Sequence, residues 1–130
     1  MFCESTEQMI WAVNNSVKKA KNWTFNYEEL KSLTENGKQM RNMWDIPMTP
    51  KSEKEQGKHP SQKPLQVMDR LIIGLTNKKE LILDPFCGSG STILSAVNNN
   101  RHYYAIDCNS KYTRLARKRI SRNIKQKSLL

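Results

Sequence analysis

The sequence predicts an α/β fold in which helices flank a parallel β-sheet. Two observations lead to this prediction: short apolar runs alternate with helical segments over residues 81–127, and an aspartate follows each apolar run. A strand, a helix, a second strand and a second helix in this order form one right-handed crossover unit of a parallel sheet. The chain has 130 residues, enough for one modest domain.

The crossover unit begins with a predicted strand over residues 81–83, and a turn with two glycines follows it. A predicted helix over 91–97 comes next and ends at three successive asparagines. The second strand covers residues 103–106, and Asn109 or Ser110 caps the final helix. The apolar side of that helix carries Tyr112, Leu115, Ala116, Ile120 and Ile124.

Four further segments precede this unit. Residues 9–13 are an apolar run before a turn, which predicts a buried strand, and residues 24–37 predict a short helix that ends at an Asn-Gly pair. Four prolines and few apolar residues over 47–64 predict a mobile linker or surface loop. Pro64 suits the first position of a helix, and the apolar stripe after it predicts a helix that ends near residues 76–77.

Composition excludes several classes of protein. No apolar run approaches the roughly 20 residues of a membrane-spanning helix, and the mean hydropathy is −0.75. The first residues lack the pattern of a secretory signal, so the expected compartment is the cytoplasm. Three cysteines without a CxxC pair argue against a disulfide framework and against a zinc site, so no metal is expected. Cys3, Cys87 and Cys108 are expected to be reduced thiols.

Positive charge is concentrated in the second half of the chain. The formal net charge is +10, and residues 66–130 hold 12 basic and 4 acidic side chains, a net charge of +8. A surface of this kind favours polyanions such as DNA or RNA through phosphate neutralisation. A solvated helix face that only aids solubility explains the charge equally well.

The strongest chemical signal is a pair of aspartates that end the two strands. Asp84 and Asp107 are 23 residues apart, and ligands of parallel sheets bind at the carboxyl edge where such residues lie. Gly88 and Gly90 let the turn between them approach a ligand closely. The turn lacks the G-x-G-x-x-G pattern, and two carboxylates would repel a pyrophosphate. They suit a ligand with an ammonium group and a ribose, as in S-adenosylmethionine, and Phe86 could add an aromatic wall.

At these residues the chain resembles a known family. The segment Asp84-Pro85-Phe86-Cys87-Gly88-Ser89-Gly90-Ser91-Thr92 is similar to the cofactor-binding loop of the site-specific DNA amino-methyltransferases, Asp-Pro-Phe-x-Gly-Ser-Gly-Thr. His59-Pro60-Ser61-Gln62-Lys63-Pro64 resembles the His-Pro-Thr-Gln-Lys-Pro signature that precedes that loop in the permuted class of the family. Trp44-Asp45-Ile46-Pro47 resembles its Trp-x-Ile-Pro segment, and Ile106-Asp107 resembles the strand-end acid. The motifs occur in family order over nearly all of the chain.

The resemblance implies a partial Rossmann-like S-adenosylmethionine-dependent methyltransferase fold and a role for each matching residue. Asp84 would hold the methionine ammonium through water or backbone, Asp107 would accept from the ribose hydroxyls, and Gln62 with Lys63 would close the methionine end of the pocket. Serine replaces the usual threonine at Ser91 and keeps the hydroxyl. The implied cofactor-binding residues are Gln62, Lys63, Asp84, Phe86, Gly88, Gly90, Ser91 and Asp107.

One departure from the family limits the activity that the resemblance implies. The family's catalytic segment is an acid or serine followed by Pro-Pro and an aromatic residue, and this chain has no Pro-Pro pair. The sequence therefore resembles the C-terminal portion of a longer enzyme, with no catalytic residue of its own. Residues 1–46 would end the catalytic half, 47–64 form the loop with the His-Pro signature, and 65–130 bind the cofactor.

The function that the resemblance implies is methylation of double-stranded DNA, at adenine N6 or alternatively at cytosine N4, on a base swung out of the duplex. A second chain could supply the catalytic half, and a basic nucleic-acid-binding module without enzymatic activity is the alternative from another class. On the final helix, Arg114, Lys118 and Arg122 are candidates for DNA phosphate contacts or for a solvated face.

Plain structural roles compete with the functional ones. Asp84 could simply form a turn before proline, and Asp107 could cap the last helix. Cys87 is interpreted as a small filler in the loop, because direct methyl transfer needs no nucleophilic thiol. Since a sheet cut partway through exposes an edge strand and apolar faces, the isolated chain is expected to be marginally stable or to aggregate.

Overall fold

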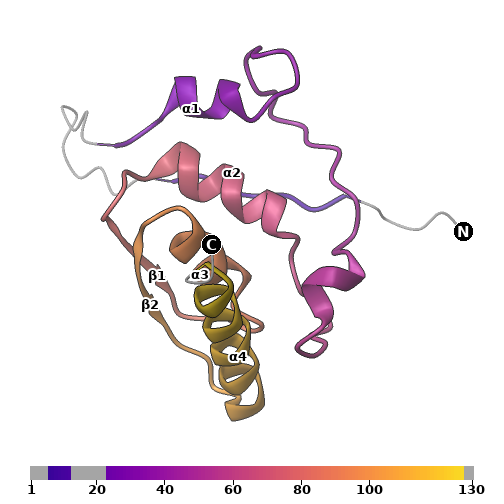
Figure 1. Cartoon of the computed structure of the whole chain (residues 1–130). Coiled ribbons are helices and arrows are strands. Elements are labelled where there is room, and N and C mark those ends of the chain that lie inside the picture. Colours follow the sequence, from indigo (N-terminus) through magenta and orange to yellow (C-terminus); the bar gives the residue numbers. More distant parts are fainter. Residues whose placement is uncertain (1–5, 13–22, 128–130) are drawn as a thin grey trace, which may run out of the picture.

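The computed structural model describes residues 6–12 and 23–127, and its helices and strands alternate over the second half of the chain (Figure 1). In chain order the elements are α1 (Tyr27–Ser32), a 3-10 helix η1 (Lys51–Lys54), α2 (Leu65–Leu75), β1 (Leu81–Asp84), α3 (Ser91–Asn98), β2 (His102–Ala105) and α4 (Ser110–Lys127).

The two strands pair in parallel, and α3 connects them. Leu81 lies opposite His102, and Asp84 lies opposite Ala105 at the carboxyl end of the sheet. Helix α3 contacts both strands and also α2 and α4, so it occupies the centre of the described structure. The predicted α/β class with a parallel sheet flanked by helices is confirmed.

The helix ends follow local chemistry. Pro64 directly precedes α2, with a φ of −59°, and the Glu53 carboxylate accepts a hydrogen bond of 3.0 Å from the Leu65 N–H. A carboxylate is favourable there because the first N–H groups of a helix are unpaired and carry partial positive charge. Asn109 caps α4, as predicted, because its Oδ1 accepts from the Lys111 N–H at 2.9 Å.

In the first part of the chain, the predicted strand is wrong, and the predicted short helix is confirmed but covers fewer residues. Residues 9–12 form no strand, and Ile10 is 93% exposed; Val13, the last residue of the predicted strand, lies outside the described residues. The helix predicted over 24–37 is only the six residues of α1. The Thr34 hydroxyl contacts the carbonyls of both Lys31 and Lys38, and such side-chain bonds compete with helix continuation.

The loop over 47–64 is packed against the rest of the structure. It contains η1, and its Thr49 and Gln62 are buried and joined by a hydrogen bond of 2.6 Å from the Thr49 hydroxyl to the Gln62 carbonyl. Of the two predicted alternatives, the structure therefore shows a surface loop rather than a mobile linker.

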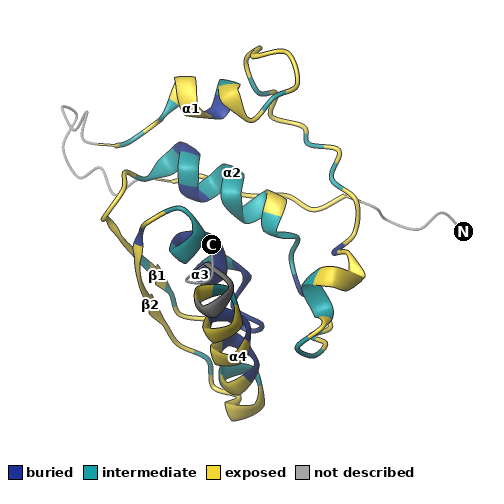
Figure 2. Ribbon diagram, viewed as in Figure 1, coloured by how far each residue is buried: buried dark blue, intermediate teal, exposed yellow. Residues whose placement is uncertain are grey.

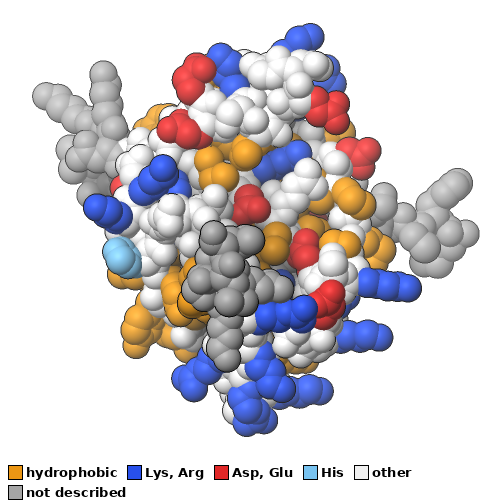
Figure 3. Space-filling view, viewed as in Figure 1, with side chains coloured by type: hydrophobic (Ala, Val, Ile, Leu, Met, Phe, Trp, Pro, Cys, Tyr) orange, Lys and Arg blue, Asp and Glu red, His pale blue; other side chains and the backbone are white. Residues whose placement is uncertain are grey.

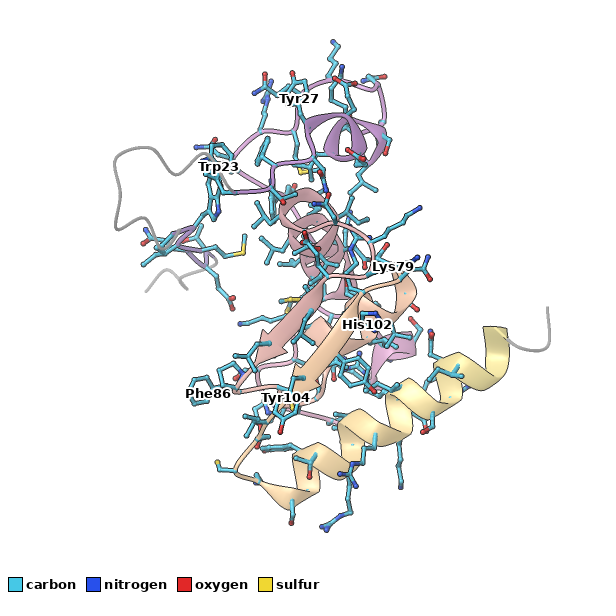
Figure 4. All side chains as sticks on the ribbon, turned by 90° about the vertical axis from the view of Figure 1, so that its left-hand side faces the viewer. Trp23, Tyr27, Lys79, Phe86, His102 and Tyr104 are labelled. Atoms are coloured by element: carbon cyan, nitrogen blue, oxygen red, sulfur yellow. The ribbon has the colours of Figure 1, made fainter. Side chains whose placement is uncertain are left out.

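Burial is concentrated on α3 and on the side of α4 that faces it (Figure 2). Ile93 in α3 is completely buried and belongs to a core cluster with Cys87 and Ile120. The sheet itself has one uncovered face among the described residues, and in Figure 4 both strands face the viewer with no described helix in front of them. We call its apolar residues, Leu81, Leu83 and Tyr104, the open sheet face; each is more than 60% exposed.

Candidate functional site

The glycine turn, residues 84–90, connects the carboxyl end of β1 to α3 and lies beside the carboxyl end of β2. Backbone hydrogen bonds continue the sheet into it: the Cys87 N–H donates to the Ile106 carbonyl at 2.9 Å, and the Ile106 N–H donates to the Asp84 carbonyl at the same distance. The two strand-end aspartates are therefore brought to one edge of the sheet, as the sequence predicts.

Asp107 connects the two strand ends. Its Oδ2 accepts a hydrogen bond of 2.8 Å from the Gly88 N–H, and its Oδ1 accepts one of 2.8 Å from the Asn109 N–H. Each carboxylate oxygen has a second lone pair, so both can still accept from a ligand. The alternative role of Asp107 as the cap of α4 is filled mainly by Asn109, whose side chain accepts a hydrogen bond from an N–H of the first helical turn.

Asp84 shapes the start of the turn. Its Oδ1 accepts a hydrogen bond of 3.1 Å from the Phe86 N–H across Pro85. This Asx turn is the plain structural role considered for Asp84, and it directs the carboxylate toward the turn's own backbone. Phe86 itself is 87% exposed and extends away from the sheet (Figure 4).

Both glycines of the turn are required by its geometry. Gly88 and Gly90 have φ angles of +49° and +77°. A Cβ on Gly90 would lie 2.7 Å from the Ala116 Cβ, and a Cβ on Gly88 would lie 3.0 Å from His59 Nε2. The turn therefore has a left-handed backbone and no room for side chains where α4 and His59 touch it.

Cys87 is buried inside the turn. Its burial raises the pKa of the thiol above the ordinary 9.0, and the negative charges of Asp84 and Asp107 raise that pKa further. A thiol that stays protonated is a poor nucleophile, which supports its interpretation as a small filler. Cys108, in contrast, is exposed.

The His-Pro segment, residues 59–64, lies against the glycine turn. The ring of His59 stacks edge-on against Tyr112 of α4, with ring centroids 4.2 Å apart. The Ser91 hydroxyl donates to the Lys63 carbonyl at 2.9 Å, which joins the two signatures directly.

The side chains of Gln62 and Lys63 have other partners in the structure. Gln62 is 8% exposed, and its Nε2 donates to the Glu53 carbonyl at 2.8 Å. Lys63 forms an ion pair of 2.6 Å with Glu7. Their expected contact with the methionine end of a cofactor remains a prediction.

Sequence reasoning missed Arg119. This arginine of α4 is 5% exposed, and its Nη1 donates to the Ser89 carbonyl at 2.7 Å, to the Ser89 hydroxyl at 3.1 Å and to the Ser91 hydroxyl at 3.2 Å. Burial lowers its pKa, and the charge of Glu53 opposes that shift. The available signal was its position beside Ala116 and Ile120 on the apolar side of the helix.

The outer side of α4 is basic. Lys and Arg side chains gather over the lower part of the molecule, where α4 lies (Figure 3). Arg114 and Lys118 are exposed, whereas Arg122 forms an ion pair of 2.7 Å with Glu55.

Residues 6–12 and 23–127 hold neither a metal-binding cluster nor a membrane-spanning helix. They contain no group of three or more His, Cys, Asp or Glu side chains placed to hold a metal ion. Within the same residues, no helix combines the length and apolar character needed to cross a bilayer.

Comparisons with known proteins agree with the geometry. The family described as "DNA methylase", N6_N4_Mtase, matches residues 1–118. Type II methyltransferase M2.LlaDCHI of Lactococcus lactis subsp. cremoris is 41% identical over 93% of this chain and 44% of its own length. Type II methyltransferase M2.DpnII of Streptococcus pneumoniae is 43% identical over 92% of this chain and 43% of its own length.

A solved structure is similar to this chain in its fold as well as in its sequence. The crystal structure of the M1.HpyAVI–SAM complex is 34% identical, with a TM-score of 0.61, over 79% of this chain and 46% of that chain. The chain thus spans less than half the length of these relatives, and the resemblance identified from its motifs is confirmed. Because the family matches almost from end to end, the chain belongs to the DNA methylase family.

Proposed function

We propose that this chain provides the cofactor-binding part of an S-adenosylmethionine-dependent DNA amino-methyltransferase. The observation that carries the proposal is the pairing of the strand ends, in which Asp107 Oδ2 accepts from the Gly88 N–H at 2.8 Å. This hydrogen bond places two carboxylates and the narrow glycine turn at one edge of the sheet.

The residues present fit S-adenosylmethionine chemically. The cofactor carries an ammonium group, a sulfonium and a ribose, and carboxylates favour the first two by charge and accept hydrogen bonds from the third. When bound, the cofactor supplies the methyl group that is transferred. M1.HpyAVI, which aligns with this chain at a TM-score of 0.61, was crystallised with SAM, and this supports the assignment.

Each residue of the site has a proposed role. Asp107 accepts from the ribose hydroxyls with the lone pairs that Gly88 and Asn109 leave free, and Asp84 holds the methionine ammonium through water or through the backbone of the turn. Phe86 gives the site an aromatic wall, and it is exposed enough to contact a ligand. The remaining proposed cofactor-binding residues are Gln62, Lys63, Gly88, Gly90 and Ser91.

The proposed substrate is an amino group of a DNA base, with adenine N6 as the first choice and cytosine N4 as the alternative. The residues that would bind the flipped base are not found in this chain, which contains no Pro-Pro pair. Arg114, Lys118 and Arg122 are proposed contacts for DNA phosphates, and the first two are exposed without an ion pair among the described residues. We expect the protein to act in the cytoplasm, on double-stranded DNA.

The open sheet face supports a second part of the proposal, namely that a catalytic half covers it. Leu81, Leu83 and Tyr104 are 66%, 63% and 63% exposed, and parallel sheets are normally covered on both faces. The relatives are more than twice as long as the segment they share with this chain. The covering half belongs either to the same longer chain or to a second polypeptide that assembles with it.

Isothermal titration calorimetry with S-adenosylmethionine tests the proposal. We expect the folded chain to bind the cofactor and Asp107→Ala to weaken binding by about 1.5–3 kcal/mol, the contribution of a hydrogen bond to a charged group. Glu28→Gln on the exposed side of α1 removes a carboxylate away from the glycine turn and should leave the affinity unchanged. A folded chain that binds DNA and ignores the cofactor would instead be a basic nucleic-acid-binding module.

A further inference from the structure

One side of α4 forms the support on which the glycine turn lies. Tyr112, Ala116 and Arg119 are spaced four and three residues apart, so they share one side of the helix. Tyr112 contacts the ring of His59, which lies at Gly88, and Ala116 lies at Gly90. Arg119 reaches the residue between those two glycines.

One nitrogen of the Arg119 guanidinium is bound to the turn and to the residue that follows it. Its Nη1 has three partners, the carbonyl and hydroxyl of Ser89 and the hydroxyl of Ser91. Its Nη2 is buried without a hydrogen-bond partner among the described residues. Since burying an arginine is unfavourable unless its donors are paired, the three contacts with Ser89 and Ser91, together with the charge of Glu53, offset part of the cost of its burial.

Ser91 extends these contacts to the other signature. Its hydroxyl accepts from Arg119 at 3.2 Å and donates to the Lys63 carbonyl at 2.9 Å. A chain of hydrogen bonds therefore runs from α4 through the first residue of α3 to the His-Pro segment. A shift of the guanidinium would change the relative positions of the two segments that carry the proposed cofactor site.

We propose that Arg119 is a positioning residue for S-adenosylmethionine binding. It fixes the Ser89 carbonyl and the Ser91 hydroxyl, and thereby sets the backbone path of Gly88 and Gly90 that the cofactor meets. The inference rests on the proposed function. It also places one arginine of the basic helix in a role other than contact with DNA.

Substitutions at Arg119 test this role by calorimetry with S-adenosylmethionine. Arg119→Met keeps a long apolar stem and loses all donors, so we expect the dissociation constant to rise about ten-fold or more. Arg119→Lys should recover part of the affinity, because one ammonium group can still donate to the Ser89 carbonyl. Ile72→Val is the control, because Ile72 is buried in α2 and forms no part of the hydrogen-bond chain.

Two results would overturn the inference. One is an Arg119→Met protein with the affinity of the unmodified chain. The other is an equal loss of affinity in Ile72→Val, with each variant measured at the same number of degrees below its own unfolding midpoint. Loss of stability alone would then explain the effect.

The amide resonances of Gly88 and Gly90 provide a readout that needs no cofactor. Arg119→Met should move both resonances, whereas Ile72→Val should leave them in place. If the unmodified chain does not bind S-adenosylmethionine, the proposed function fails. The glycine resonances still decide whether Arg119 determines the backbone conformation of the turn. Resonances that stay unchanged in Arg119→Met would refute the positioning role.

Discussion

Replacing Gly90 by alanine should destabilise the folded chain by about 2–5 kcal/mol, because two separate costs add. The first is conformational: Gly90 has a φ of +77°, and a residue with a Cβ in this left-handed region costs about 1–2 kcal/mol. The second is steric: the new Cβ would lie 2.7 Å from the Ala116 Cβ and 3.2 Å from its Cα. Overpacking of this kind costs about 1–3 kcal/mol.

Gly37 provides a matched control for the conformational cost. It has a φ of +59°, and a Cβ built on it would meet no atom within 4 Å. Gly37→Ala should therefore show the first cost without the second. The free energy of unfolding should fall further in Gly90→Ala than in Gly37→Ala by the steric part, about 1–3 kcal/mol.

Urea unfolding followed by circular dichroism measures these differences, and Ala116→Gly adds a double-mutant cycle. In the unmodified chain Ala116→Gly should cost about 1 kcal/mol, because glycine is unfavourable inside a helix. In the Gly90→Ala background it removes the clashing Cβ and should restore much of the lost stability. Strict additivity of the two substitutions, or equal effects of Gly90→Ala and Gly37→Ala, would refute the close contact between the turn and α4.

Three further predictions follow from burial and charge. Alkylation of buried Cys87 should be much slower than that of exposed Cys108 in mass spectrometry, and equal rates would contradict the burial of Cys87. Because the pKa of Cys87 is raised in the folded chain, its contribution to stability should be complete below pH 9 and should fall as the pH rises above that value. Leu83→Lys on the open sheet face should change the free energy of unfolding by no more than about 0.5 kcal/mol and should reduce aggregation, as measured by light scattering. A Leu83→Lys variant that does not fold would show that this face is covered in the isolated chain. Arg122→Ala should cost only about 0–1 kcal/mol, a loss that shrinks in high salt, because its ion pair with Glu55 is exposed.

The crossover unit was predictable because its signals are local. The strands predicted over 81–83 and 103–106 are β1 (Leu81–Asp84) and β2 (His102–Ala105), each within one residue at either end. Apolar runs bounded by asparagine, aspartate and glycine mark such elements without knowledge of the tertiary structure. The strand predicted over 9–13 failed because an apolar run becomes a strand only when a neighbouring strand pairs with it, and residues 6–12 have none among the described residues.

The candidate site was predictable only in part. The glycine turn and the two aspartates are marked by residue type, since only certain residues tolerate that backbone and end strands in this way. The burial of Arg119 was not predictable from the sequence, because it depends on oxygens of Ser89 and Ser91 that are 30 and 28 residues distant in the chain. The ion pair of Lys63 with Glu7 joins residues 56 apart and has no local signal either.

The hydrogen bonds that hold the glycine turn all come from one continuous stretch of chain. In the described structure, the turn and the adjoining Ser91 bond to the Lys63 carbonyl, to Ile106 and Asp107, and to Arg119. A gene rearrangement that moved the remainder of such an enzyme from one end of this stretch to the other would break none of these bonds. The same unit can therefore stand first or last in a polypeptide, which gives circularly permuted gene orders a physical basis.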